Sequence, residues 1–205
     1  MLLHQYAKSE YANFKWFVKR LFIGKSYDKT ISKFIKTNLK EGSVILNIGS
    51  GYWTPYDTDI RKKSKKLYNI DTSIFVKIFR FFNCKRIVLD DQNIYEIIND
   101  YKIDAIISFH SMCFIDIDLP KLIQFCIKNK INFLFDWIVV NDIYKVEGLS
   151  RFCYGESKFE IFNLMETHNL NIEDVRLKRK VISKEQIYEG GRYFVKTSFN
   201  KNIYS

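Results

Sequence analysis

Short apolar runs alternate with amphipathic segments along the middle of the chain. Five runs have the length of strands, and each ends at glycine or at polar residues: 43–48, 67–70, 86–89, 104–109 and 131–135. Such runs are typical of strands that are buried on both faces of a sheet. Apolar residues at three- and four-residue spacing predict helices over 12–23, 28–39, 75–82, 94–98, 118–127 and 158–168.

The order of these elements indicates an α/β fold. Strands that alternate with helices form a mostly parallel sheet with helices on both faces. Two later segments, 174–183 and 192–199, alternate enough for strands, and a turn at 189–191 precedes the last one. Their connection is too short for an ordinary crossover helix, so we expect an antiparallel strand pair at the C-terminal edge of a Rossmann-like sheet.

Composition excludes several protein classes. Of the 205 residues, 47% are hydrophobic and 17% aromatic, which is enough for a sizeable core and rules out wholesale disorder. With 8 Gly and 2 Pro, the chain is neither collagen-like nor a low-complexity linker. No uncharged apolar run reaches the roughly 18 residues of a spanning helix, and Lys8 and Glu10 interrupt any signal-peptide pattern. We therefore expect a cytoplasmic protein.

Cysteine, histidine and charge narrow the chemistry further. The four cysteines are widely spaced and the three histidines do not cluster, so we expect neither a disulfide framework nor a metal site. The formal net charge is +10, with basic runs at 61–66 (RKKSKK) and 176–180 (RLKRK). These runs suit either phosphate contacts or solvated faces, and composition does not choose between them.

Polar residues gather where the predicted strands end. In open α/β sheets, ligands bind beyond the carboxyl ends of the strands. The residues at these ends are Gly49, Ser50, Gly51, Asp71, Asp90, Asp91, Ser108, His110 and Asp136. Their shared position predicts one ligand site along that edge of the sheet.

The first two strand ends suit an adenosine ligand. Glycine lets the chain turn sharply and lets a ligand approach the backbone closely. Asp71 lies 22 residues after Gly49, where its carboxylate can accept both hydroxyls of a ribose. A nicotinamide dinucleotide prefers a third glycine near its pyrophosphate, but Gly51 is followed by Tyr52 and Trp53. S-adenosylmethionine carries no phosphate and fits this loop better.

Four motifs resemble those of class I S-adenosylmethionine-dependent methyltransferases. Residues 44–51 (VILNIGSG) resemble the first motif, 67–71 (LYNID) the second, 89–91 (LDD) the third and 104–110 (DAIISFH) the fourth. The resemblance implies the class I methyltransferase fold for a single domain over 1–205. In that domain, 1–40 form a helical cover, 43–140 the cofactor-binding core, and 141–205 the acceptor cover and closing strands.

The resemblance also implies roles for single residues. It assigns the cofactor to Asn47, Gly49, Ser50, Gly51, Asp71, Thr72, Asp90, Asp91 and Ser108. The family often has an acid at the position of Asn47, where it holds the methionine amino group. His110 and Asp136 are the candidate catalytic residues, as general base and as base or acceptor-orienting group. Alternatives remain open: Asp71, Asp90 and Asp91 could cap helices, and His110 could be a structural histidine.

The expected function is methyl transfer to an oxygen or nitrogen of a small acceptor, with a sugar or glycan precursor as the first guess. One alternative is an RNA methyltransferase that uses the basic runs as a phosphate track. Another is a non-catalytic, methyltransferase-like scaffold protein. Cofactor binding separates the scaffold from the enzymes, and steep salt dependence of nucleic-acid binding would support the RNA enzyme.

Overall fold

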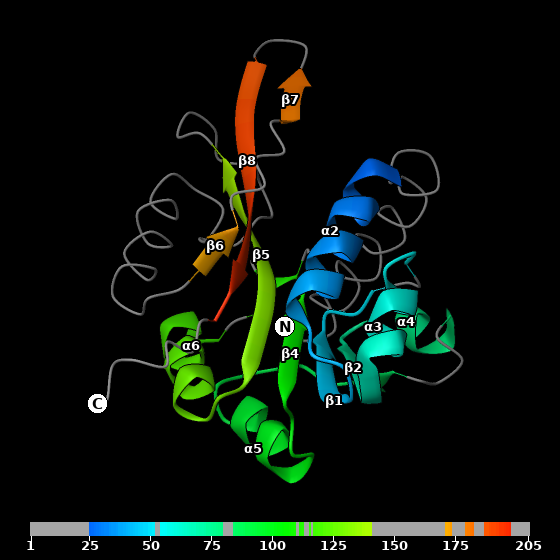
Figure 1. The fold of residues 1–205 in the computed structure, drawn as a ribbon, viewed down its shortest axis with the longest axis vertical. Helices are drawn as coiled ribbons and strands as arrows, with labels where there is room; N and C mark the ends of the chain where they lie inside the picture. Colours follow the sequence, from blue (N-terminus) through cyan, green and yellow to red (C-terminus); the bar gives the residue numbers. More distant parts are fainter. Residues whose placement is uncertain are drawn as a thin grey trace. The chain divides into compact units, whose positions relative to one another are not determined.

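The computed structural model describes residues 25–51, 54–79, 84–109, 111–112, 115, 117–140, 171–173, 179–182 and 187–197 (Figure 1). The chain divides into two compact units, Met1–Ile107 and Ser108–Ser205, and each is described by itself. The helices expected at 12–23 and 158–168 lie outside the described residues. The single domain expected from the sequence stays a prediction.

Parallel strands form the sheet of the first unit. They are β1 (Ser43–Ile48), β2 (Ser64–Asp71), β3 (Lys85–Arg86) and β4 (Ala105–Ser108), in the order β3-β2-β1-β4. The last residue of β4, Ser108, already belongs to the second unit. Nearly every residue of β1 and every residue of β4 is buried, as expected for strands covered on both faces. The apolar runs in the sequence therefore predicted the central strands β1 and β4 correctly.

The third strand is shorter than expected. Residues 86–89 were predicted to form it, but β3 ends at Arg86 and Val88 is exposed. The amide Nδ2 of Asn93 donates to the carbonyl oxygen of Val88, and the backbone N–H of Asp90 donates to Asn93 Oδ1. These contacts at the start of α5 (Asn93–Asp100) draw the chain out of the sheet.

The described residues of this unit contain three further helices: α2 (Lys25–Asn38), α3 (Asp57–Lys63) and α4 (Ile74–Phe79). The start predicted for α2 at residue 28 is wrong, because the helix begins three residues earlier and Asp28 lies buried in its first turn. The sequence did not predict α3, which lies partly in the basic run. Its buried residues are Asp57, Asp59 and Ile60, so it lacks the apolar stripe that marks most helices.

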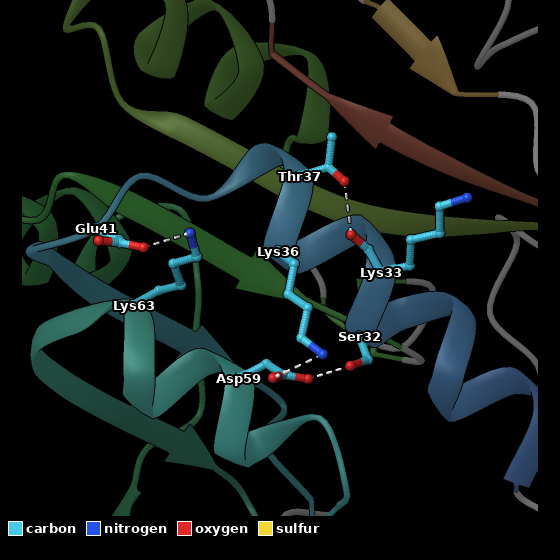
Figure 2. A network of polar contacts seen from close by, with 7 residues as sticks. All are labelled: Ser32, Lys33, Lys36, Thr37, Glu41, Asp59 and Lys63. Carbon is cyan, nitrogen blue, oxygen red and sulfur yellow. Dashed lines mark hydrogen bonds and ion pairs between the residues drawn. The ribbon is translucent and has the colours of Figure 1, made fainter.

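Polar contacts join α2 to α3 (Figure 2). The hydroxyl of Ser32 donates to Asp59 Oδ2, and Lys36 Nζ lies 3.3 Å from Asp59 Oδ1. At the end of α3, Lys63 Nζ lies 3.1 Å from Glu41 Oε1. The buried carboxylate of Asp59 therefore has a hydroxyl and a cation beside it, which offsets its loss of hydration.

The second unit contains α6 (Leu119–Lys128) and the strands β5 (Asn132–Val140), β6 (Asn171–Glu173), β7 (Arg179–Ile182) and β8 (Ile187–Lys196). The predicted start of α6 is confirmed, with Asp118 accepting a hydrogen bond from the backbone N–H of Lys121. Strand β8 pairs with β5, with β6 and with β7, each time in antiparallel orientation. The antiparallel closing strands expected from the sequence are therefore present.

The turn expected at 189–191 is wrong. These residues lie inside β8, where Gly190 pairs with Val140 and Gly191 with Val139 of β5. Long-range strand pairing thus overrides the local preference of adjacent glycines for a turn. The fold class is confirmed in both its parts: parallel strands alternating with helices in the first unit, and antiparallel strands in the second. No helix in the described part of the chain is long and apolar enough to span a membrane.

Candidate functional site

The loop after β1 is built on two glycines in the left-handed region. Gly49 has φ +60° and Gly51 has φ +56°. Residues other than glycine rarely adopt these values. Between them, the backbone N–H of Ser50 donates to the carbonyl oxygen of Ile70 at 3.1 Å. The glycines therefore turn the chain at the carboxyl end of β1 while Ser50 keeps it attached to β2.

Asp71 ends β2 and is hydrogen-bonded to this loop. Its Oδ2 accepts the backbone N–H of Gly51 at 2.9 Å, and its Oδ1 accepts the backbone N–H of Ser73 at 2.9 Å. The side chain is buried, with 7% of its surface exposed. The structure thus brings together Gly51 and Asp71, which the sequence placed in one site. Two N–H donors fix the carboxylate in one orientation.

Asp71 does not cap α4. The hydroxyl of Ser73 accepts the backbone N–H of Val76 at 3.2 Å, and α4 begins at Ile74. Ser73 therefore has the capping role that was the alternative reading for Asp71. The carboxylate instead links the loops that follow the first two strands.

Asn47 is paired with Asn69, a contact that the sequence analysis missed. The two residues face each other in the β1–β2 register, and Asn47 Nδ2 donates to Asn69 Oδ1 at 2.9 Å. Both are buried, at 4% and 2% exposure. The sequence offered a signal: Asn47 stands two residues before Gly49, and Asn69 stands two residues before Asp71, the matching candidate of the next strand. In parallel strands of matched register, equal offsets bring such residues side by side.

Ser50 and Thr72 contact the residues around β3. Ser50 Oγ lies 3.5 Å from Sγ of Cys84, and both side chains are buried. The carbonyl oxygen of Thr72 accepts a hydrogen bond from Nε of Arg86 at 3.0 Å. Cys84, which the sequence did not single out for the site, therefore contacts the glycine loop through Ser50.

Asp90 accepts two backbone hydrogen bonds near the start of α5. Its Oδ1 accepts the backbone N–H groups of Gln92 and Asn93, at 3.0 and 2.8 Å. Asp90 thus holds the turn that leads to Gln92, the N-cap residue of α5, and its contact with adenine stays a prediction. Asp91 follows it and is exposed.

The remaining candidates belong to the second unit. Ser108 is fully buried, and its Oγ has no hydrogen-bond partner among the described residues. Asp136 lies in β5 of the second unit and is 3% exposed. His110 lies outside the described residues. Within the described part of the chain, no group of three or more His, Cys, Asp or Glu is placed to hold a metal ion.

Of the comparisons with known proteins, only the one with solved structures found similar chains. No protein-family model matches the sequence, and no curated protein matches it. Solved structures do. An S-adenosylmethionine-dependent methyltransferase from Aquifex aeolicus is 16% identical, with 88% of this chain and 97% of that one covered, at a TM-score of 0.43. Precorrin-6y C5,15-methyltransferase from Geobacter metallireducens is 11% identical, with 83% and 88% covered and a TM-score of 0.47.

A third similar structure is described as a decarboxylase. Precorrin 8w decarboxylase from Methanobacterium thermoautotrophicum is 12% identical, with 82% of this chain and 89% of that one covered, at a TM-score of 0.46. At such identities the likeness concerns how the chain folds. The fold class rests on the chain's own strand order, in which parallel strands alternate with helices and antiparallel strands follow.

Proposed function

We propose that the protein binds S-adenosylmethionine at the carboxyl ends of β1 and β2 and transfers its methyl group to a small acceptor. The observation that carries the proposal is the hydrogen bond between the N–H of Gly51 and the carboxylate of Asp71. It joins a left-handed glycine loop to an oriented, charged acceptor. A ribose presents two hydroxyl donors. It suits a site where glycines leave the backbone open and a carboxylate is held in one orientation.

The residues around this hydrogen bond also fit the cofactor's lack of phosphate. Nothing in the loop of Gly49–Gly51 recruits a phosphate through lysine or arginine, and the sequence continues with Tyr52 and Trp53 in place of a third glycine. The Asn47–Asn69 pair would hold the two strand ends in register under the bound ligand. When bound, the cofactor would supply an activated methyl group on a sulfonium.

The proposal retains His110 and Asp136 as the groups that act on the acceptor. His110 would take the proton that an acceptor hydroxyl or amine loses as the new bond to carbon forms. Asp136 would orient the acceptor. The acceptor class is an oxygen or nitrogen nucleophile on a small molecule, and sugars and glycan precursors come first in a screen.

Calorimetric titration tests cofactor binding directly. The wild-type protein should bind S-adenosylmethionine and S-adenosylhomocysteine, and should not bind NAD. Asp71→Asn should weaken binding at least tenfold, because hydrogen bonds to a charged group contribute about 1.5–3 kcal/mol each. Asp104→Asn is the matched control: Asp104 accepts the backbone N–H of Val44 at 2.8 Å, at the amino end of β1.

Ligand analogues separate ribose recognition from damage to the loop. Wild-type protein should prefer adenosine to 2′,3′-dideoxyadenosine, and Asp71→Asn should bind the two equally. A folded wild-type protein that binds neither sulfur compound would refute the proposal and favour the scaffold alternative. Equal losses in Asp71→Asn and Asp104→Asn would refute the role of Asp71, since both changes neutralise a carboxylate that accepts a backbone N–H.

A further inference from the structure

A cationic surface of the first unit has no part in the proposed cofactor site. Five of the six residues at 61–66 are Lys or Arg, spanning the end of α3 and the start of β2. Arg61, Lys62, Lys65 and Lys66 are exposed. Lys63 differs, because its Nζ is paired with Glu41 (Figure 2). Most of the charge of this run thus faces solvent.

Two stacked tyrosine rings connect this basic run to a further lysine, Lys85. Nζ of Lys66 lies 4.9 Å from the ring centroid of Tyr68, whose ring stacks on that of Tyr101 with centroids 4.4 Å apart. Nζ of Lys85 lies 4.4 Å from the Tyr101 centroid and donates a hydrogen bond to the Tyr101 hydroxyl. We call Lys62, Lys65, Lys66, Tyr68, Lys85 and Tyr101 the lysine–tyrosine surface.

The stacked rings restrain the charged groups. A free lysine loses much side-chain entropy when it is immobilised against a ligand. Lys66 and Lys85 already rest on partly buried tyrosine rings, so less of that entropy remains to be lost. Lys66 and Lys85, at the two ends of the stacked tyrosine pair, match a partner whose negative charges repeat along a chain.

The apolar residues of the unit argue against a membrane partner. Surface helices that bind lipid place large apolar side chains beside their lysines. The large apolar side chains that are exposed in the described structure are Ile74, Ile78 and Val88, on α4 and after β3, and none is part of the lysine–tyrosine surface. Lysines interleaved with aromatic rings are instead typical of proteins that follow a nucleic-acid backbone.

We propose that the lysine–tyrosine surface binds the phosphate backbone of a nucleic acid. The basic run lies at the amino end of β2, and Lys66 pairs with Val44, four residues before Ile48. At about 3.3 Å per residue, roughly 13 Å of strand separates this register position from the end of β1, where the glycine loop starts. The basic run is therefore held away from the proposed cofactor loops, whereas Lys85, which pairs with Ile70, is the member of the surface nearest to them. The inference does not depend on the proposed function.

Binding of a labelled single-stranded RNA of about 20 nucleotides, followed by fluorescence anisotropy over a range of salt concentrations, tests the surface. The variant carries Lys62→Gln, Lys65→Gln and Lys66→Gln. The control carries Lys121→Gln, Lys128→Gln and Lys130→Gln, three exposed lysines of the second unit with the same loss of charge. Thermal unfolding checks that both variants are folded.

The salt dependence gives the decisive number. Each phosphate contact with single-stranded nucleic acid contributes about 0.7 to the slope of log K against log salt, so three lost contacts should flatten it by about 2. The control should keep the wild-type slope. Equal slopes in the two variants would show that only the diffuse net charge attracts RNA, and would overturn the proposal.

Two other outcomes would also overturn it. If the surface variant keeps RNA binding but loses binding to vesicles of phosphatidylcholine and phosphatidylserine, the partner is a membrane. If it keeps RNA binding but self-associates, the lysines serve to keep the start of β2 from pairing with other chains. Single-stranded DNA, run in parallel, shows whether ribose is needed in addition to phosphate.

Discussion

Replacing Gly51 by Ala separates what the glycine does for folding from what it does for the ligand. At φ +56° an alanine is strained, at a cost of about 1–2 kcal/mol. The added Cβ itself meets only the carbonyl oxygen of Gly49, at 3.9 Å, which is ordinary van der Waals contact. The whole cost therefore comes from the backbone. For a chain of this length, about 1.5 kcal/mol lowers the melting temperature by roughly 3–6 °C.

Gly42 supplies a matched control. It has φ +75°, and nothing lies within 4 Å of a Cβ built on it, so Gly42→Ala has the same kind of backbone cost. It precedes β1, at the end opposite the glycine loop. We expect both variants to lose the same few degrees in a thermal melt. In calorimetric titration, only Gly51→Ala should lose affinity for S-adenosylmethionine, by about tenfold or more, because its methyl group intrudes where a ligand would approach the backbone.

Two results would refute this reasoning. If Gly51→Ala and Gly42→Ala bind S-adenosylmethionine as tightly as each other, Gly51 is needed only to turn the chain. If Gly51→Ala lowers the melting temperature far more than Gly42→Ala does, the loop around Gly51 is packed more tightly than the 3.9 Å contact indicates.

Two further predictions concern the second unit. Thr197→Val should destabilise the protein by about 2 kcal/mol in urea unfolding. Thr197 Oγ1 accepts the N–H of Phe133 and donates to the carbonyl oxygen of Ile131, and in the variant both groups would stay buried without this partner. A loss of stability no larger than that of Thr37→Val, on an exposed helix surface, would contradict the prediction. Burial raises the pKa of Cys126 from 9.0 to about 12. The unfolded thiol ionises first as pH rises, so the stability due to this group should fall between pH 9 and 12, and Cys126→Ala should remove that part of the pH dependence in unfolding titrations.

Much of the fold was predictable because the central strands are buried on both faces. Residues 43–48 and 104–109 could be assigned to strands from their apolar content alone, and the structure places β1 and β4 there. The strand ends could be listed in the same way, which placed Gly51 and Asp71 in one candidate site. Helix α3 could not be predicted, since the contacts of Asp59 come from Ser32 and Lys36, which lie more than twenty residues earlier.

From the sequence alone one could infer the alternation of strands and helices, the turn that needs glycine after β1, and the acid at the end of β2. These features are local: burial period and backbone φ depend on a few neighbouring residues. Only the tertiary structure decided that Asp71 accepts from Gly51, that Asn47 pairs with Asn69, and that 189–191 continue a strand. Each of these depends on register between strands that are distant in sequence, and register is settled when whole strands pair and bury their faces together.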